Sequence, residues 1–501
     1  MRTSGILMPV FSLPSRFGIG AFDKESYNFV DFLNKSAQGV WQVLPLGPTG
    51  YGNSPYQPVS AFAGNPYFIS LEQLIEEGYL TWEECNACDF GSDQEKVDYG
   101  ALYFNRKGLL QKAYQRFCEK IKADTQLQKE YKSFIQEEEY WLLDYALFCV
   151  LKDLCDGKPW YEWEADYKKR NQNTLAKIQK DHETEIHYYF FTQFVFMKQW
   201  NALHEYAKEK LIKIVGDMPF YVSLDSVDVW QHPEVFQLDR DLLPKVVAGC
   251  PPDAFSRTGQ MWGNPIYDWK ALAKDSYSWW VKRMARNAKL FDTVRIDHFH
   301  GFAQYYAIPY GAEDATKGKL EKGPGIAFFE ALNEQLGKVS LIAEDLGEVT
   351  EENEALLEKT GIPGMKVLQY AYTSWDSKYL THRHDKNCVV YTGTHDNTPL
   401  RAWVEEIGEG HRDFTRRYVN SRNSDFGGLV WDVIREAYHS PADLCMIPLQ
   451  DYLVKGREAR LNTPGTLEGN WEWRLLPNFL SEALAVSIRE MSETYGRVPN
   501  P

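Results

Sequence analysis

The feature that most constrains the fold is a series of short apolar segments, each of which ends in polar residues. They span residues 39–46, 214–217, 293–297, 341–345, 365–372, 389–396 and 444–450. Short runs rich in β-branched and apolar residues are typical of buried strands. Stretches with helical spacing separate several of them, such as the run that contains Phe196, Trp200, Leu203 and Ala207. Strands that alternate with helices predict an α/β fold with a parallel sheet, and this many units favour a closed (β/α)8 TIM barrel over an open doubly wound sheet.

Two long segments exceed the length of a simple strand–helix connection and predict insertions in the barrel. Residues 75–185 carry apolar side chains at helical spacing, with charged residues between them, and are expected to form a largely helical insertion. Residues 224–290 include a Gly- and Pro-rich stretch, 247–265, which is expected to form a lid loop over the barrel mouth. The barrel then comprises residues 1–74 and 186–501.

Composition excludes some classes of partner. The 501-residue chain has 55 Lys and Arg against 70 Asp and Glu, a formal charge of −15, which argues against nucleic acid and anionic membrane surfaces. Aromatic residues make up 15% of the chain, which suits the stacking of sugar rings as well as a large core. No apolar run reaches membrane-spanning length, residues 1–14 lack a signal-peptide pattern, and the 8 cysteines show no disulfide spacing, so a cytoplasmic protein is expected.

The segment 293–297 places a cation beside a carboxylate. Val294 and Ile296 alternate with Arg295 and Asp297, so the two charged side chains share one face of the predicted strand. A fixed cation lowers a carboxyl pKa, so we expect an ionised Asp297 that acts as a nucleophile or an electrostatic stabiliser. An ordinary buried ion pair at a strand end explains the pattern equally well.

Four carboxylates follow separate predicted strands. Asp217, Asp297, Glu344 and Asp396 each lie at the carboxyl end of one of these segments. In a barrel such ends converge on one mouth. The chain shows no phosphate-binding loop or dinucleotide fingerprint, so several carboxylates with aromatic residues nearby favour glycosidic chemistry, in which one carboxylate attacks the anomeric carbon and a carboxylic acid protonates the leaving oxygen.

Two alternatives remain open on these residues. His298 and His300, with Asp297, His395 and Asp396, are ligand types for a metal-dependent hydrolase. If the strand ran on, however, the two histidines would lie on the face opposite Asp297, which disfavours a shared metal. The other alternative is a glycan-binding protein without catalytic activity.

Several motifs together resemble one enzyme family. They are Ser54-Pro55-Tyr56-Gln57, Gly216-Asp217-Met218-Pro219, Trp262-Gly263-Asn264-Pro265, Arg295-Ile296-Asp297-His298-Phe299, Ala343-Glu344-Asp345-Leu346-Gly347, Gly393-Thr394-His395-Asp396-Asn397 and Asn470-Trp471-Glu472-Trp473-Arg474. The set is similar to the motifs of the 4-α-glucanotransferases, also called amylomaltases or disproportionating enzymes (glycoside hydrolase family 77). The similarity runs from Leu13 to beyond Arg474.

The resemblance implies a barrel related to that of the α-amylases, without their C-terminal β-sandwich domain. It implies that Asp297 is the nucleophile, Glu344 the general acid/base and Asp396 the stabiliser of the distorted donor sugar. The other implied substrate-binding residues are Arg295 and His395, which flank that sugar, and Tyr56, Ser54, Asp217, Gln260, Trp262, Asn462 and Phe255. The implied reaction moves an α-1,4-glucan segment between maltooligosaccharides, or to glucose, with no metal or organic cofactor; a retaining glucan hydrolase is the nearest alternative.

The chain departs from the family pattern in places. His300 stands where the family usually has arginine, and Ala254 precedes Phe255 where a second aromatic residue is common. Thr398 and Pro399 follow the Asp396 motif where an acidic residue is frequent. None of these departures removes a carboxylate. A lid that carries Phe255 and Trp262 is expected to exclude water, so that transfer to a sugar acceptor outcompetes hydrolysis.

Overall fold

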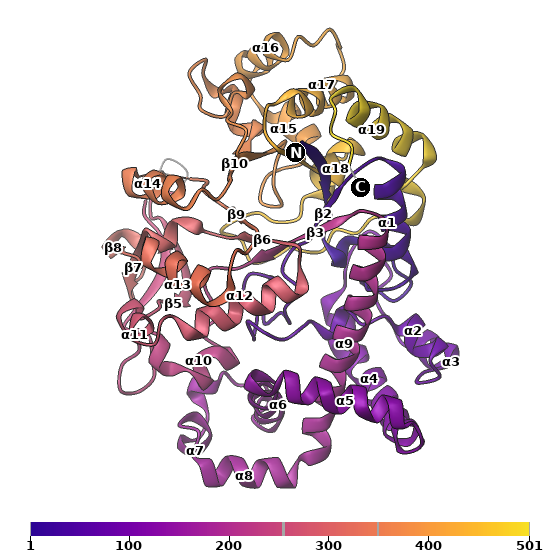
Figure 1. The fold of residues 1–501 in the computed structure, drawn as a ribbon, viewed down its shortest axis with the longest axis vertical. Coiled ribbons are helices and arrows are strands. Elements are labelled where there is room, and N and C mark those ends of the chain that lie inside the picture. Colours follow the sequence, from indigo (N-terminus) through magenta and orange to yellow (C-terminus); the bar gives the residue numbers. More distant parts are fainter. Residues whose placement is uncertain (1, 253–255, 348–349, 500–501) are drawn as a thin grey trace.

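The core of the computed structural model, which describes residues 2–252, 256–347 and 350–499, is a closed barrel. In this part of the chain its eight parallel strands, given in order around the barrel, are β1 (Thr3–Leu7), β12 (Leu444–Pro448), β11 (Cys388–Tyr391), β10 (Gly364–Val367), β9 (Leu341–Ala343), β6 (Thr293–Ile296), β3 (Lys213–Met218) and β2 (Val40–Gln42). Strands β10, β9, β6, β3 and β2 cross the middle of the molecule in Figure 1. The predicted (β/α)8 barrel is confirmed.

Strand β1 is absent from the sequence prediction. Its residues begin with the polar pair Thr3-Ser4, which does not read as a buried strand, yet Ser4 is fully buried and its Oγ lies 3.5 Å from Ser492 Oγ. Gly5 permits the close packing of β1 on β2, because a Cβ at this position would lie 2.6 Å from the Val40 carbonyl oxygen. Parallel strands are covered on both faces, so polarity alternation gives no signal here.

Several predicted strands are too long at their carboxyl ends. The segment predicted over 365–372 pairs as a strand only to Val367, and Leu368–Thr373 forms a 3-10 helix. Likewise β6 ends at Ile296, and His298 adopts a left-handed conformation with φ of 49° before a second 3-10 helix. The chain therefore leaves the barrel at the residues that carry the carboxylates, so the two histidines do not continue the strand.

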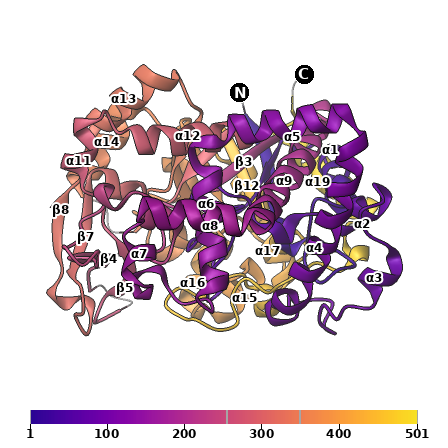
Figure 2. The same ribbon diagram turned by 90° about the horizontal axis from the view of Figure 1, so that it is seen from below.

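Helices dominate the region between α2 (Leu71–Glu76) and β3. They are α3 (Trp82–Asn86), α4 (Tyr99–Ala123), α5 (Thr125–Glu137), α6 (Glu139–Leu154), α7 (Ala165–Lys168), α8 (Gln172–Asp181) and α9 (Glu183–Glu209). Helices α4 to α8 make up the lower part of the molecule in Figure 1, and α6 and α8 lie in front when it is seen from below in Figure 2. The buried ion pair between Glu138 and Arg286, at 3.0 Å, joins this region to helix α12 (Ser278–Leu290) of the barrel.

The stretch 247–265 is not the continuous loop that its Gly and Pro content predicts. Strands β4 (Val246–Cys250) and β5 (Gln260–Pro265) pair antiparallel and extend into a sheet with β7 (Gln304–Pro309) and β8 (Lys319–Lys322), in the order β5-β4-β7-β8. The register shifts between Val247 and Gly249, where a side chain would meet the Gln260 carbonyl oxygen at 2.1 Å. This close approach requires glycine at position 249, so Gly249 marks a β-bulge within the sheet and not a loop.

Further helices complete the barrel. They are α1 (Lys24–Lys35), α10 (Val227–Gln231), α11 (Trp269–Lys274), α13 (Ile326–Leu336), α14 (Glu351–Thr360), α15 (Leu400–Glu406), α16 (Glu409–Tyr418), α17 (Phe426–His439), α18 (Leu449–Tyr452) and α19 (Glu482–Thr494). From the end of β12 to residue 499 the described chain is helix and loop. The buried Arg497 donates to the Thr3 carbonyl oxygen at 3.0 Å, so the two ends of the described chain meet beside β1 (Figure 1).

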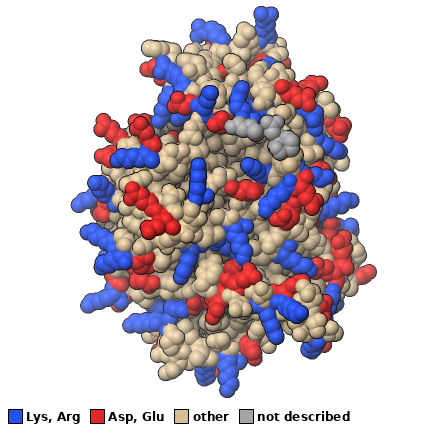
Figure 3. Space-filling view, viewed as in Figure 1, with Lys and Arg blue, Asp and Glu red and all other residues tan. Residues whose placement is uncertain are grey.

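The surface carries charges of both signs. On the face shown in Figure 3, acidic and basic side chains are interspersed. Among the described residues, no helix combines the length and the apolar character that a membrane crossing would need.

Candidate active site

A buried ion pair forms the floor of the barrel mouth. Asp217 on β3 and Arg295 on β6 are register partners on neighbouring strands. The Arg295 Nη1 atom donates to both carboxylate oxygens of Asp217, at 2.6 and 2.7 Å, and both side chains are buried, with 3% and 0% of their surface exposed. Although burial acts to lower it, Asp217 and then Asp297 raise the pKa of Arg295 well above its ordinary value. A permanent cation is therefore fixed below the mouth.

Asp297 follows β6 directly and lies above this pair. Its backbone N–H donates to the Met218 carbonyl oxygen at 3.0 Å, which continues the β3–β6 ladder by one residue. Its Oδ1 atom accepts from Arg295 Nη1 at 3.3 Å, and 27% of its side chain is exposed. Arg295 thus contacts Asp297, as the strand pattern predicts, but its closer partner is Asp217. The carboxylate of Asp297 is the one that a ligand can reach.

Glu344 follows β9, the neighbour of β6 on the other side. Ile296 and Ala343 are register partners, so Asp297 and Glu344 are the next residues on adjacent strands. The Glu344 N–H donates to the Ile296 carbonyl oxygen at 3.0 Å. Its side-chain Oε2 accepts from the His298 backbone N–H at 2.8 Å. The carboxylate of Glu344 is therefore held against the peptide that follows Asp297.

Both carboxyl groups of this pair have raised pKa values. Burial raises the pKa of Asp297 well above its ordinary value; Arg295 opposes this, and Glu344 and Asp217 add to it. Burial also raises the pKa of Glu344, against the charge of Arg295. The expected net lowering of the Asp297 pKa is therefore wrong, because desolvation and neighbouring carboxylates outweigh one cation that Asp217 already binds. Two such groups titrate as a pair and hold a proton between them into a higher pH range than isolated carboxyls.

Asp396 lies on the loop after β11, which approaches the mouth from the opposite side. Its Oδ1 atom accepts from Asn462 Nδ2 at 2.7 Å and lies 3.4 Å from His395 Nε2. The side chain of Asp396 is 43% exposed, whereas that of His395 is 2% exposed. Asp396 adds to the charge that raises the pKa of Asp297, so the two carboxylates face the same space.

Aromatic rings line this side of the mouth. The Tyr56 ring stacks on that of His395, with centroids 5.0 Å apart and planes at 13°, and its hydroxyl donates to Asp217 Oδ2 at 2.8 Å. Ser54 holds the backbone of this loop, since its Oγ accepts from the Tyr56 N–H at 3.2 Å. The Trp471 ring lies 5.7 Å from Tyr56 and 6.0 Å from His395. Trp471 is absent from the predicted site residues, although its motif, Asn470 to Arg474, is part of the resemblance.

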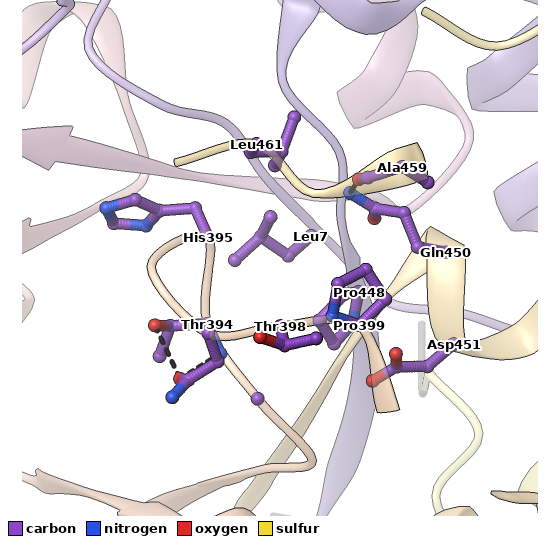
Figure 4. A pocket seen from close by; sticks show the side chains of 12 residues that line it. Leu7, Thr394, His395, Thr398, Pro399, Pro448, Gln450, Asp451, Ala459 and Leu461 are labelled. Atoms are coloured by element: carbon purple, nitrogen blue, oxygen red, sulfur yellow. Dashed lines mark hydrogen bonds between the residues drawn. The ribbon is translucent and has the colours of Figure 1, made fainter. Parts of the chain in front are cut away.

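The loop that carries His395 is held by hydrogen bonds to a residue after β12. A cavity of about 10 Å³ separates it from the residues after β12, and Figure 4 shows Thr394, Thr398 and Asp451 along its wall. The buried Asp451 accepts from the Thr392 hydroxyl at 2.5 Å and from the Leu400 N–H at 2.7 Å. Sequence reasoning missed Asp451, whose one signal is an acidic residue just beyond a strand end.

Trp262 and Gln260 come from strand β5 of the side sheet. The Trp262 Nε1–H donates to Gln260 Oε1 at 3.1 Å, and its ring stands edge-on to His298, with centroids 5.1 Å apart at 90°. Burial lowers the pKa of His298 to about 3, so this imidazole is neutral at pH 7. Trp262 thus contacts the residue next to Asp297, and Gln260 contacts Trp262. Phe255 and its neighbour Ala254 lie outside the described residues.

His300 is buried in the 3-10 helix that follows the site, with 7% of its surface exposed. Neither ring nitrogen has a hydrogen-bond partner among the described residues. The electrostatic interaction of His300 with Glu344 opposes the rise in the pKa of that carboxyl group. In residues 2–252, 256–347 and 350–499, no group of three or more His, Cys, Asp and Glu side chains is arranged to hold a metal ion.

Comparisons with known proteins identify the family of this chain. The sequence model of a family described as 4-alpha-glucanotransferase matches residues 8–479. The 4-alpha-glucanotransferase of Clostridium butyricum is 43% identical, over 98% of this chain and 100% of that protein. That of Thermus thermophilus is 42% identical, over 99% of both chains. The structure of an amylomaltase from Streptococcus agalactiae in complex with acarbose superposes with a TM-score of 0.96 at 38% identity, covering 99% of this chain and 100% of that one. With the family's model and full-length relatives both matched, the chain belongs to the 4-alpha-glucanotransferase family, whose members are glucan-transferring enzymes.

Proposed function

We propose that this enzyme transfers α-1,4-glucan segments between maltooligosaccharides, or to glucose, with retention at the anomeric carbon. The observation that carries the proposal is the 2.8 Å bond from the His298 N–H to Glu344 Oε2, because it joins the carboxylate of Glu344 to the peptide beside Asp297. Adjacent strands lie about 4.8 Å apart, which suits the roughly 5–5.5 Å between carboxyl groups that retaining enzymes use.

In the first half-reaction Asp297 attacks the anomeric carbon of the donor sugar. The bond from that carbon to the glycosidic oxygen breaks, and the oxygen leaves with the proton of Glu344. In the second, the 4-hydroxyl of the acceptor attacks the same carbon, gives its proton to Glu344 and releases the Asp297 carboxylate. The two paired carboxyl groups both have raised pKa values and share a proton, and in this proposal Glu344 carries that proton at the start of each cycle while Asp297 is ionised beside Arg295.

The remaining side chains act on the developing positive charge and on the ring hydroxyls. Arg295 binds Asp217 most closely, so the carboxylates of Asp297 and Asp396 leave the mouth with excess negative charge, which stabilises an oxocarbenium-like transition state. In this proposal the Tyr56 ring, which stacks on His395, packs against the donor sugar, and Asn462 orients Asp396 through its 2.7 Å hydrogen bond. The proposed substrate is α-1,4-glucan, consistent with the acarbose in the Streptococcus agalactiae complex.

A maltosyl fluoride donor tests the assignment, because fluoride leaves without help from an acid. Glu344→Gln is expected to accumulate a covalent maltosyl adduct on the peptide that contains Asp297, detected by mass spectrometry of the intact and digested protein. Asp297→Asn is the matched control and is expected to form none. An adduct on another residue, or in the Asp297→Asn variant, contradicts the nucleophile assignment. Incubation of the unaltered enzyme with maltotriose completes the test: a ladder of longer products with glucose means transfer, and short sugars alone mean hydrolysis.

A further inference from the structure

The guanidinium of Arg460 joins the two loops that carry Asp396 and Asn462. Its Nη1 donates to the Thr398 hydroxyl at 2.7 Å and its Nη2 to the Asp396 carbonyl oxygen at 3.1 Å. Its Nε donates to the Asn462 carbonyl oxygen at 2.8 Å. Thr398 and Asp396 belong to the loop after β11, and Asn462 lies 66 residues beyond Asp396 in the chain. One rigid group therefore spans two segments that share no strand or helix.

The hydrogen bonds of Arg460 lie beside the one between Asn462 and Asp396, which orients the Asp396 carboxylate. Asn462 Nδ2 donates to Asp396 Oδ1 at 2.7 Å, and Arg460 holds the backbone of both partners of that bond. The Asp396 side chain is 43% exposed, so packing alone does not fix its direction. The planar guanidinium presents its N–H groups in a fixed fork, which a flexible ammonium group cannot reproduce.

We propose that Arg460 is a positioning residue for catalysis, which sets the direction of the Asp396 carboxylate toward the donor sugar through the loop backbones. The inference rests on the role proposed above for Asp396. A misplacement of about 1 Å in a reacting group costs on the order of 10²-fold in rate, so loss of this tie is expected to lower kcat without removing any group that touches the sugar.

Arg457 supplies a matched control three residues away. Its guanidinium donates to Glu406 Oε1 from Nε and Nη2, at 2.9 and 2.7 Å, in an exposed ion pair. Arg457→Ala removes the same chemical group from the neighbouring 3-10 segment and leaves the hydrogen bonds of Arg460 in place. Its kcat and KM for maltotriose are expected to match those of the unaltered enzyme.

The experiment compares Arg460→Ala, Arg460→Lys, Arg457→Ala, Asn462→Ala and Asp396→Asn by steady-state kinetics on maltotriose, with thermal unfolding of each. For Arg460→Ala we expect kcat to fall about 10- to 100-fold with KM changed less than about 3-fold. Arg460→Lys is expected to restore little, and added guanidinium ion to restore part of the Arg460→Ala loss. Arg460→Ala and Asn462→Ala are expected to be less than additive, because both disturb the direction of one carboxylate.

The outcomes separate the two proposals. An active Asp396→Asn variant overturns the role of Asp396 and the inference with it. An inactive Asp396→Asn with an unimpaired Arg460→Ala overturns the inference alone. The positioning role of Arg460 is also overturned if Arg460→Lys is fully active, if Arg457→Ala loses as much kcat as Arg460→Ala, or if the losses from Arg460→Ala and Asn462→Ala simply add.

Discussion

Asp217 binds Arg295 more tightly than Asp297 does, through both of its carboxylate oxygens at 2.6 and 2.7 Å. The fully buried Asp217 side chain has no route to solvent once this cation is removed. The ion pair therefore supports the fold of the mouth and the charge state of Asp297 at the same time.

Arg295→Met is expected to destabilise the enzyme and to shift its pH profile. An unpaired buried carboxylate costs about 3–5 kcal/mol in free energy of unfolding. The pKa of Asp297 rises further without the cation, so less of it is ionised at a given pH and the acid limb of kcat/KM moves to higher pH. Denaturant unfolding and pH–rate profiles on maltotriose measure the two effects. Arg295→Met with Asp217→Asn should regain stability but not activity; an acid limb that moves down would contradict this account.

Tyr56 makes two separable contacts, a ring stack on His395 and a hydroxyl bond to Asp217. Tyr56→Phe keeps the first and loses the second. A hydrogen bond to a charged group is worth about 1.5–3 kcal/mol, so we expect kcat/KM on maltotriose to fall roughly 10- to 100-fold. Tyr56→Ala loses the platform as well and is expected to fall further. Equal losses in the two variants would mean that the ring contributes nothing.

The Trp262 ring makes an edge-on contact with His298, the residue next to Asp297. Trp262→Ala removes that ring and opens its space to water, so the ratio of hydrolysis to transfer is expected to rise at least about 3-fold, because orientation then favours the acceptor sugar less. Chromatography of maltotriose products together with reducing-end release gives the ratio. Trp82→Ala, a change in helix α3 beside Arg16, serves as control. A ratio that stays constant in Trp262→Ala argues against water exclusion by this ring.

His300 reaches Glu344 electrostatically and opposes the rise in its pKa. His300→Arg places a permanent cation there, which lowers the pKa of Glu344 further. Glu344 must be protonated to act as the acid, so the alkaline limb of kcat is expected to move to lower pH, by about half a unit or more. His300→Gln, which carries no charge, should not move the limb in that direction. A limb that is unmoved or raised in His300→Arg would show that this side chain does not act on Glu344.

Asp23 predicts a pH dependence of stability away from the site. It caps helix α1, accepting from the Glu25 N–H at 3.0 Å, and burial raises its pKa to about 7. Because the folded chain binds this proton more tightly than the unfolded chain, the stabilisation is complete below the ordinary value of 3.8 and is lost as the pH rises through 7. Asparagine caps a helix equally well. Asp23→Asn should therefore raise Tm at pH 8 by about 2 °C or more, with a smaller gain at pH 5. A larger gain at pH 5 would reverse the sign of this argument.

The sequence predicts that the carboxylates converge on one mouth. It does not predict which of them binds Arg295. Asp217, Asp297, Glu344 and Asp396 each follow an apolar segment, and a barrel brings such positions to one mouth whatever the details of packing. Which of them binds Arg295 depends on the register between β3 and β6, and nothing within either strand encodes that register. The pattern along one strand therefore points to Asp297, and the neighbouring strand supplies the stronger partner.

Strands with unusual composition could not be predicted from the sequence either. Strand β1 begins with Thr3-Ser4, and β4 and β5 include Gly249 and Gly263, so polarity and propensity both argue against the strands that backbone pairing forms. Arg460 and Asp451 were missed for a related reason. Each acts on backbone groups of a distant loop, and no local motif marks such a contact.

The barrel closes by pairing β1 with β12, its first and last strands in the chain, so it can close only late in synthesis. Strand β1 leaves the ribosome first and meets β2 early, but its other edge stays unpaired until residue 448 has emerged. At about 5–20 residues per second, translation leaves that edge open for roughly 20 to 90 seconds. An exposed strand edge can pair with other chains, so the nascent enzyme is open to misassociation at β1 throughout this interval.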